Sequence, residues 1–367
     1  MNNKKKINII LVCAAVAVLA LILCMILFSG RKEKDDTITV GFVMSGSMDE
    51  QGWNGLHYQG IKEACDELQL RLIVKEEIAE NSGQCEGAIR ELAEEKADII
   101  ILSSYGYAAE VQDLVREYND IVFYSESFDY SGDNLNCYFA RIYQARYLAG
   151  VVAGMETKTD CIGYVAAMPN CEVNRGINAF TLGVQSVNPN ARVIVAWSNS
   201  WDDSEEEKRL AEELIVSENV DILTYHQNQP NVVEIAEQYD IASIGYHENA
   251  ENVSENYLTS VVFHWNLTYK ELVLDYMKGK SDVVNTYWFG LDKNAIGLTE
   301  LSSAVSEETR AEVEAAKESI LMGVPVFSGK IYDTNGTLRC DDGENISDEI
   351  LMREMDWYVK GVDFYEE

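Results

Sequence analysis

The sequence predicts an α/β protein with two Rossmann-like lobes, each built on a parallel sheet, and one transmembrane helix ahead of them. Short runs of apolar and β-branched residues alternate with segments of helical periodicity. Two strand-start patterns recur at nearly one spacing, and an uncharged run lies near the N-terminus. The 367 residues allow two domains of ordinary size, and a hydrophobic content of 47% is enough for a core in each.

The N-terminal segment predicts a membrane anchor. Ile9 to Phe28 is an uncharged run of 20 residues, which as a helix at about 1.5 Å per residue spans a bilayer core. Three lysines precede it, which places the N-terminus in the cytoplasm and the rest of the chain outside. Residues 1–36 are therefore expected to be cytoplasmic lysines, an uncleaved anchor and a charged tether. A cleaved signal peptide and lipoprotein processing at Cys24 stay open as alternatives.

The elements of the first lobe alternate regularly after the tether. Strands are expected at residues 38–43, 70–74, 99–102 and 121–124, and helices at residues 53–68, 82–95 and 108–118. Within the second of these helices, Cys85, Ala88, Ile89 and Leu92 recur at helical spacing. This order predicts consecutive βα units and a parallel sheet.

The same pattern then begins again. Gly41 to Val43 has a counterpart in Gly163 to Val165, 122 positions later, and Ala97 to Ile100 has one in Val220 to Leu223, 123 positions later. Both matches lie at strand starts, so they predict a second lobe of the same design. A strand at residues 260–263 and helices ending near residues 277 and 322 are expected to complete both lobes, if the chain crosses between them.

These patterns divide the chain into four parts. Residues 1–36 are expected to form the anchor and tether, and residues 37–367 the two-lobed domain that follows it. The first lobe is expected to comprise residues 37–145 and 248–283, and the second residues 146–247 and 284–330. Turn signals at Asn335-Gly336 and Asp342-Gly343 predict that the tail, residues 331–367, folds as a hairpin plus a short helix.

The net charge and the cysteine content limit the classes of partner, cross-link and metal site that the chain can have. The formal net charge of −33 leaves no broad positive surface, which disfavours nucleic acid as a partner. The exported part has Cys65, Cys85, Cys137, Cys161, Cys171 and Cys340. Their spacing defines no disulfide framework, so paired and free thiols both stay open. The absence of a CxxC pattern argues against structural zinc.

Sequence motifs for catalysis are missing. There is no HExxH, no GxxxxGK[ST], no glycine-rich dinucleotide fingerprint after the first strand and no GxSxG. We therefore expect no enzyme and no cofactor. In open α/β sheets ligands bind at the carboxyl ends of strands. The loops expected to line a cleft between two such lobes begin at Met44, Ser103, Ser125, Met168, Ser198, His226 and Gly245.

Those loops are rich in aromatic residues, including Trp53, Tyr105, Trp201 and Trp265. Aromatic rings with a few polar groups are the inventory needed to hold a flat ligand between two lobes.

Residues 38–362 resemble the basic membrane protein family of ABC-transporter substrate-binding proteins, the PnrA-like or purine nucleoside receptor group. The resemblance rests on residues 48–53, 138–150, 162–167, 175–180 and 186–189, and on 348–357 in the tail. It implies a type I periplasmic-binding-protein fold, in which a three-strand hinge joins the lobes. It also implies closure on a purine nucleoside or purine base and delivery to an ABC permease and its ATPase subunits.

The resemblance also implies site residues. Trp53, with Asn54 beside it, matches the aromatic residue that stacks on the base, and Trp201 or Trp265 would complete the sandwich. Relatives commonly have His-Thr-Asp-Ser-Pro where this chain has His226 to Pro230, and Gly-Tyr-Asp where it has Gly245 to His247. The candidate ligand-binding residues are Asp49, Trp53, Asn54, Tyr105, Tyr107, Glu126, Trp201, His226, Asn228, His247 and Trp265, with Glu126 or Asp49 as the replacement carboxylate.

The resulting hypothesis is a single-pass protein of the cell membrane whose binding domain captures a purine-like ligand on the extracellular side. A ligand-sensing surface regulator with the same fold, not coupled to a permease, is the alternative. An extracellular nucleoside hydrolase is disfavoured, because no acid/base constellation with a nucleophile emerges.

Overall fold

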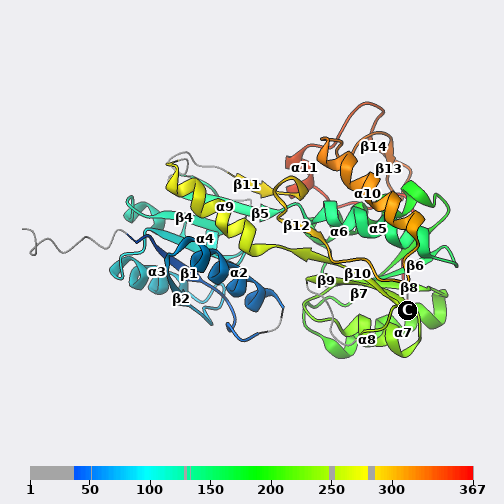
Figure 1. The fold of residues 1–367 in the computed structure, drawn as a ribbon, viewed down its shortest axis with the longest axis horizontal. Coiled ribbons are helices and arrows are strands. Elements are labelled where there is room, and N and C mark those ends of the chain that lie inside the picture. Colours follow the sequence, from blue (N-terminus) through cyan, green and yellow to red (C-terminus); the bar gives the residue numbers. More distant parts are fainter. Residues whose placement is uncertain are drawn as a thin grey trace, which may run out of the picture. The chain divides into compact units, whose positions relative to one another are not determined.

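A computed structural model describes residues 37–50, 52–127, 130–132, 134–247, 253–279 and 286–366. The expected anchor, residues 1–36, lies outside the described residues. Within the described ranges no helix is long and apolar enough to cross a membrane. Thr39 to Glu367 form one compact unit, which carries both lobes (Figure 1).

The first lobe is built on a six-stranded parallel sheet in the order β11-β5-β4-β3-β1-β2. Its central strand has the sequence Ile-Ile-Ile-Leu, and all four residues are buried, as is usual for a parallel strand covered on both faces. The strands are β1 (Thr39–Val43), β2 (Arg71–Lys75), β3 (Ile99–Leu102), β4 (Val122–Glu126), β5 (Leu135–Ala140) and β11 (Thr286–Phe289).

Helices from two distant parts of the chain cover this sheet. They are α2 (Trp53–Leu68), α3 (Gln84–Glu94), α4 (Tyr107–Val111), the 3₁₀ helix η1 (Leu114–Glu117) and α9 (Trp265–Met277). Figure 1 shows α9 beside α2, and at Gly60 of α2 a Cβ atom would lie 2.5 Å from the Cβ of Trp265. Glycine is therefore required at this crossing.

The second lobe repeats the design on a seven-stranded sheet in the order β12-β10-β9-β8-β6-β7-β15. Its strands are β6 (Cys161–Ala166), β7 (Arg192–Trp197), β8 (Ile222–His226), β9 (Ala242–His247), β10 (Tyr257–Phe263), β12 (Ile296–Leu298) and β15 (Val362–Phe364). Only β12 is antiparallel to its neighbour among these pairs. The helices are α5 (Ile142–Glu156), α6 (Cys171–Val187), α7 (Ser204–Glu218), α8 (Asn231–Gln238), η3 (Leu291–Lys293) and α10 (Glu307–Leu321).

The internal repeat predicted from the sequence is confirmed. The order β2-β1-β3-β4-β5 in the first sheet corresponds to β7-β6-β8-β9-β10 in the second. Gly41 and Gly163 hold equivalent positions, pairing with Ile100 and Leu223 in the neighbouring strands. At each glycine a Cβ atom would lie within 3 Å of a leucine side chain, Leu92 or Leu223. The same packing constraint therefore recurs in both lobes.

The chain passes between the lobes three times within the described residues, near Arg141, His264 and Gly290. The boundaries expected at residues 248 and 284 are wrong. Strand β10 pairs with β9 in the second sheet, and β11 pairs with β5 in the first. Periodicity identifies a strand but does not say which sheet it joins, since that depends on long-range pairing.

The tail packs on the second lobe. Its hairpin joins β13 (Ile331–Tyr332) to β14 (Leu338–Cys340) through a turn in which Gly336 has φ 82°, and the short helix is α11 (Asp348–Arg353). Both were predicted. The last strand, β15, which extends the second sheet, was not. The six cysteines of the described residues are all free thiols.

Candidate ligand-binding site

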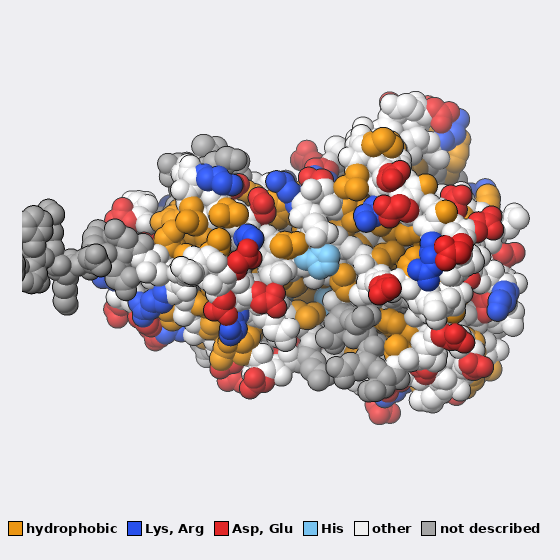
Figure 2. Space-filling view, in the orientation of Figure 1, with side chains coloured by type: hydrophobic (Ala, Val, Ile, Leu, Met, Phe, Trp, Pro, Cys, Tyr) orange, Lys and Arg blue, Asp and Glu red, His pale blue; other side chains and the backbone are white. Residues whose placement is uncertain are grey.

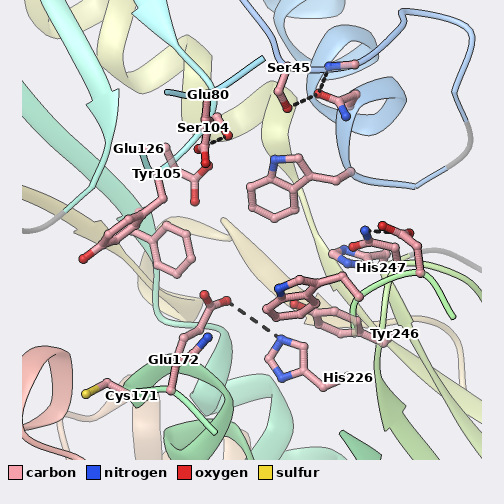
Figure 3. Close-up of a pocket in the computed structure, with 18 of the residues that line it drawn as sticks. Ser45, Glu80, Ser104, Tyr105, Glu126, Cys171, Glu172, His226, Tyr246 and His247 are labelled. Carbon is pink, nitrogen blue, oxygen red and sulfur yellow. Dashed lines mark hydrogen bonds and ion pairs between the residues drawn. The ribbon is translucent and has the colours of Figure 1, made fainter. Parts of the chain in front are cut away.

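A cavity of about 1110 Å³ lies at the carboxyl ends of the strands of both sheets. Each of the loops expected to line a cleft contributes to its wall, so that prediction is confirmed. Figure 3 shows side chains of both lobes pointing into the cavity. Figure 2 shows acidic and basic side chains interspersed on the face in view, without a broad basic patch there.

Trp53 forms the first-lobe platform of the cavity. It begins α2 directly after Gly52, whose φ of 96° turns the loop into the helix. Its indole N–H donates to the Ser103 carbonyl at 3.2 Å. The ring lies 4.2 Å from His57 and 5.5 Å from Trp265, centroid to centroid. The hydrogen bond and the ring contacts hold the indole in place, which suits a stacking surface.

Aromatic residues also form the second-lobe wall. The rings of Trp201 and His226 lie 5.8 Å apart, and those of His226 and Tyr246 lie 4.6 Å apart. His247 ends β9 with φ 75° and lies 5.9 Å from Trp53, which brings the two walls into contact at one edge. A flat ligand would therefore meet aromatic rings from both lobes.

Two carboxyl groups reach the cavity from opposite lobes. Glu126 ends β4 and is 3% exposed, and its Oε2 atom has no hydrogen-bond partner among the described residues. Glu172 lies in the first turn of α6 (Figure 3). Burial raises the pKa of Glu126 well above its usual range, and the charges of Glu172 and Glu80 raise it further. Burial also raises the pKa of Glu172, although Arg175 and Arg146 oppose this effect.

The cavity histidines are neutral at pH 7. Burial lowers the pKa of His226 well below its usual range, and the Arg146 charge lowers it further. Burial, followed by Arg146, lowers the pKa of His247 to about 3. Each ring therefore offers one N–H donor and one acceptor. Within the described residues no group of His, Cys, Asp or Glu is placed to hold a metal ion.

Most of the residues predicted from the sequence line the cavity. They are Trp53, Asn54, Tyr105, Glu126, Trp201, His226, Asn228 and His247. The side-chain amides of Asn54 and Asn228 already form hydrogen bonds with other residues of the cavity wall. The Oδ1 atom of Asn54 accepts from the Gly46 N–H at 3.0 Å, and the Nδ2 atom of Asn228 donates to Asp202 at 2.9 Å.

Three predicted residues are not in the cavity wall. Tyr107 is fully buried in the core of the first lobe, where its hydroxyl donates to the Ile78 carbonyl. Trp265 is 3% exposed and packs behind Trp53. Asp49 is exposed on the first loop, outside the cavity. Each of these residues follows a strand, as predicted. Packing, which the sequence pattern does not report, sets the direction of its side chain.

The wall contains residues that the sequence analysis missed. Tyr246 directly precedes His247 at the end of β9, and Glu172 follows the loop that begins at Met168, so both had a positional signal. Met352 and Arg353 come from α11 in the tail, a segment that carries part of the family resemblance but in which no site residue was predicted. The other missed residues are Ser45, Gly46, Glu50, Glu80, Ser104, Phe139, Asn170, Cys171, Arg175, Asp202 and Gln229.

Comparison with known proteins agrees with this architecture. Residues 37–327 match the family model described as ABC transporter substrate-binding protein, PnrA-like. The chain belongs to this family. It is therefore an extracytoplasmic, non-enzymatic binding protein that takes up a small molecule within an ABC transporter system.

Two curated relatives cover nearly the whole chain. A putative ABC transporter glucose-binding protein of Haloferax volcanii is 31% identical over 336 residues, covering 91% of this chain and 82% of the relative. A purine-binding protein of Brucella abortus is 29% identical over 346 residues, covering 92% of this chain and 96% of the relative.

Solved structures support the type I periplasmic-binding-protein fold. A transcriptional activator of the comK gene from Bacillus halodurans superposes with a TM-score of 0.70 at 23% identity, covering 78% of this chain and 98% of that one. A solute-binding protein from Conexibacter woesei gives a TM-score of 0.66 at 18% identity, covering 79% of this chain and 99% of that one. These similarities establish the fold.

Proposed function

We propose that this family member captures a purine nucleoside or purine base between its lobes and delivers it to an ABC permease and its ATPase. The observation that carries the proposal is Trp53, an indole at the cavity wall whose N–H is bound to Ser103 and whose ring is backed by His57 and Trp265. A ring held in this way loses little freedom when a flat base stacks on it. The Brucella relative, named for purine binding, supports the same ligand class.

The polar groups of the cavity suit the edge of such a ligand. Glu126, Glu172 and the neutral histidines His226 and His247 offer both donors and acceptors around the aromatic surfaces. Carboxylates outnumber guanidinium groups in the wall, where Arg175 and Arg353 are the lining arginines among the described residues. This balance favours a neutral nucleoside or base over a nucleotide, because a phosphate would meet like charge.

A sugar is the second candidate ligand. The Haloferax relative, named as a putative glucose-binding protein, favours it. Carboxylates that accept from hydroxyl groups and aromatic rings that pack on apolar faces also suit a pyranose. Family membership favours transport over the alternative of a sensing surface regulator.

A ligand screen with the purified full-length protein tests the proposal. A ligand that binds only the folded state raises its apparent stability. We expect an upward shift of the unfolding temperature with adenosine, guanosine, adenine or hypoxanthine, and a smaller shift or none with D-glucose. A shift with glucose and with none of the purines would replace the purine assignment by the sugar. Recovery of unchanged ligand after incubation excludes turnover.

We further propose that Ile9 to Phe28 tethers the binding domain to the outer face of the cell membrane. The uncharged run and the three lysines before it support this. The intact mass of protein extracted from membranes tests it. The full chain is expected, whereas a chain acylated at Cys24 or beginning beyond a cleavage site would identify one of the alternatives.

A further inference from the structure

Helix α11 lies at the junction of the lobes, although it belongs to the tail, beyond residue 327 where the family match ends. Figure 1 shows α11 close to α6. Its residues Met352 and Arg353 line the ligand cavity. The tail therefore contributes to the site that the two lobes form.

The second lobe holds α11 and the segment after it through buried polar side chains of α6. Arg175 donates from Nη1 to the Leu351 carbonyl at 2.6 Å. Asn174 and Asn178 donate from Nδ2 to the carbonyls of Met355 and Trp357, at 2.9 and 2.8 Å. These three α6 side chains are at most 3% exposed. Buried hydrogen bonds of this kind are costly to break, so α11 moves with the second lobe.

A second contact ties α11 to the crossovers. Asp348 binds Arg141 with both carboxylate oxygens, Oδ1 at 2.8 Å from Nη1 and Oδ2 at 2.5 Å from Nη2. Arg141 precedes α5 at the first crossover. Bidentate pairs of this geometry are stronger and more directional than single contacts.

Arg141 extends this contact to the third crossover. Its guanidinium lies 4.1 Å from the centroid of the Trp288 ring, and its Nε donates to the Trp288 carbonyl at 3.0 Å. Its backbone N–H donates to the Phe289 carbonyl at 2.6 Å. Arg141 thus links the first crossover, to which it belongs, to the third, and α11 holds its side chain in place.

We propose that α11 is a third wall of the ligand site, and that Asp348 is a positioning residue which couples this wall to the hinge through Arg141. Met352 then contacts the bound ligand, and Asp348 sets the separation of the lobes without touching it. This inference rests on the proposed function for its ligand, but the coupling to the hinge does not depend on which ligand binds.

Substitutions at the wall test the contact. The probes are adenosine, guanosine, adenine, hypoxanthine and D-glucose, titrated by calorimetry into the full-length protein. Met352→Trp narrows the cavity and is expected to raise the Kd of the binding probe at least about tenfold, as overpacking does. The control is Met322→Trp, at the exposed end of α10, where the side chain is 79% exposed. Equal affinity for Met352→Trp and wild type would remove α11 from the site.

A double-mutant cycle tests the coupling. Asp348→Asn and Arg141→Gln are each expected to raise the Kd by about threefold to thirtyfold. The double variant should raise the Kd no more than the stronger single variant does, because the two residues act through one contact. Asp348→Glu keeps the carboxylate and should retain most of the affinity. Glu349→Gln, an exposed neighbour, is the control. Additive losses, or an unchanged Kd for Asp348→Asn, would overturn the coupling.

A readout without ligand separates this inference from the ligand assignment. Loss of the Asp348–Arg141 pair should increase the radius of gyration measured by small-angle X-ray scattering, and Glu349→Gln should not. If none of the probes binds the wild type, the proposed ligands are wrong, and the scattering comparison decides on the hinge by itself. Identical scattering for Asp348→Asn and wild type would overturn the inference.

Discussion

The Oε1 atom of Glu172 lies 3.9 Å from the Nε2 atom of His226 on the second-lobe wall of the cavity. This separation is too long for a hydrogen bond. Burial keeps the pKa of His226 well below its usual range, so the imidazole is neutral at pH 7 and the two groups form no ion pair. Both groups face the cavity (Figure 3), where a ligand can bridge them.

Removing the carboxylate tests whether the ligand uses this gap. Glu172→Gln keeps the shape of the side chain but replaces one acceptor oxygen by a donor. We expect the affinity for the binding purine to fall about tenfold, the usual effect of losing one charged hydrogen bond. Calorimetric titration measures it. Glu349→Gln, on the exposed face of α11, is the matched control. Wild-type affinity in Glu172→Gln would place the ligand elsewhere in the cavity.

Trp53→Ala removes the stacking platform. Stacking of a base on an aromatic ring contributes about 1 to 3 kcal/mol, so the Kd should rise by about one to two orders of magnitude. Trp197→Ala is the control, because Trp197 ends β7 outside the cavity and contacts Tyr358. Circular dichroism checks that both variants fold. Loss of binding in the control alone would exclude Trp53 from the site.

His247 gives the free energy of unfolding a pH dependence. Its pKa is about 3 in the folded protein, whereas the unfolded chain binds a proton near pH 6.5. The unfolded state therefore takes up the extra proton as the pH falls, and this residue should lower the stability by about 2 kcal/mol between pH 6.5 and 5.

His247→Asn isolates this contribution. Asparagine tolerates the φ of 75° at this position and does not titrate. Urea unfolding at several pH values should give a flatter profile for this variant. Parallel profiles for the variant and wild type would contradict a neutral His247.

Glu207 should act in a different pH window. Its side chain is fully buried in α7, where burial raises its pKa to about 7 although the Asn231 amide opposes the shift. Its contribution to stability is fully present below about pH 4.5 and is lost as the pH rises through about 7.

Glu207→Gln should match wild type at pH 5 and exceed it by about 2 kcal/mol in the free energy of unfolding at pH 8. Chemical denaturation measures the difference. Glu205→Gln, an exposed carboxylate of the same helix, serves as the control and should show no such change. An advantage of equal size at both pH values would have a cause other than titration.

Arg146 is a buried charge whose guanidinium makes no hydrogen bond to the described residues. Its guanidinium lies 4.1 Å from the Tyr246 ring, and none of its three nitrogens has a hydrogen-bond partner there. Replacing such a charge by an apolar side chain of similar size is often stabilising, so Arg146→Met should raise the free energy of unfolding by about 1 kcal/mol or more. Thermal and urea unfolding measure this. A loss of stability would show that the charge is compensated in solution.

Strands, helices and the duplicated lobe design followed from local patterns. Helix α2 and strand β3 have the bounds expected from periodicity, since apolar spacing reports directly which face of an element is buried. The loops of the cavity also followed, because parallel strands place all their carboxyl ends on one edge.

Three features of the site could not be predicted from the sequence and became visible only in the tertiary structure. Tyr107 and Trp265 begin the helices that follow β3 and β10, yet packing turns both side chains away from the cavity. Strand β10 belongs to the second sheet, which moved a lobe boundary. Met352 reaches the cavity because α11 docks on α6 and on Arg141, residues far away in the sequence.

The sequence by itself determined the class of architecture, the family and the edge of the sheets at which a ligand binds. Only the tertiary structure decided which side chains face that ligand and that the tail supplies a wall. The physical reason is the separation along the chain of the residues that interact. Periodicity and turn chemistry are local, whereas the direction of Trp265 and the docking of α11 are set by contacts between residues more than 100 positions apart.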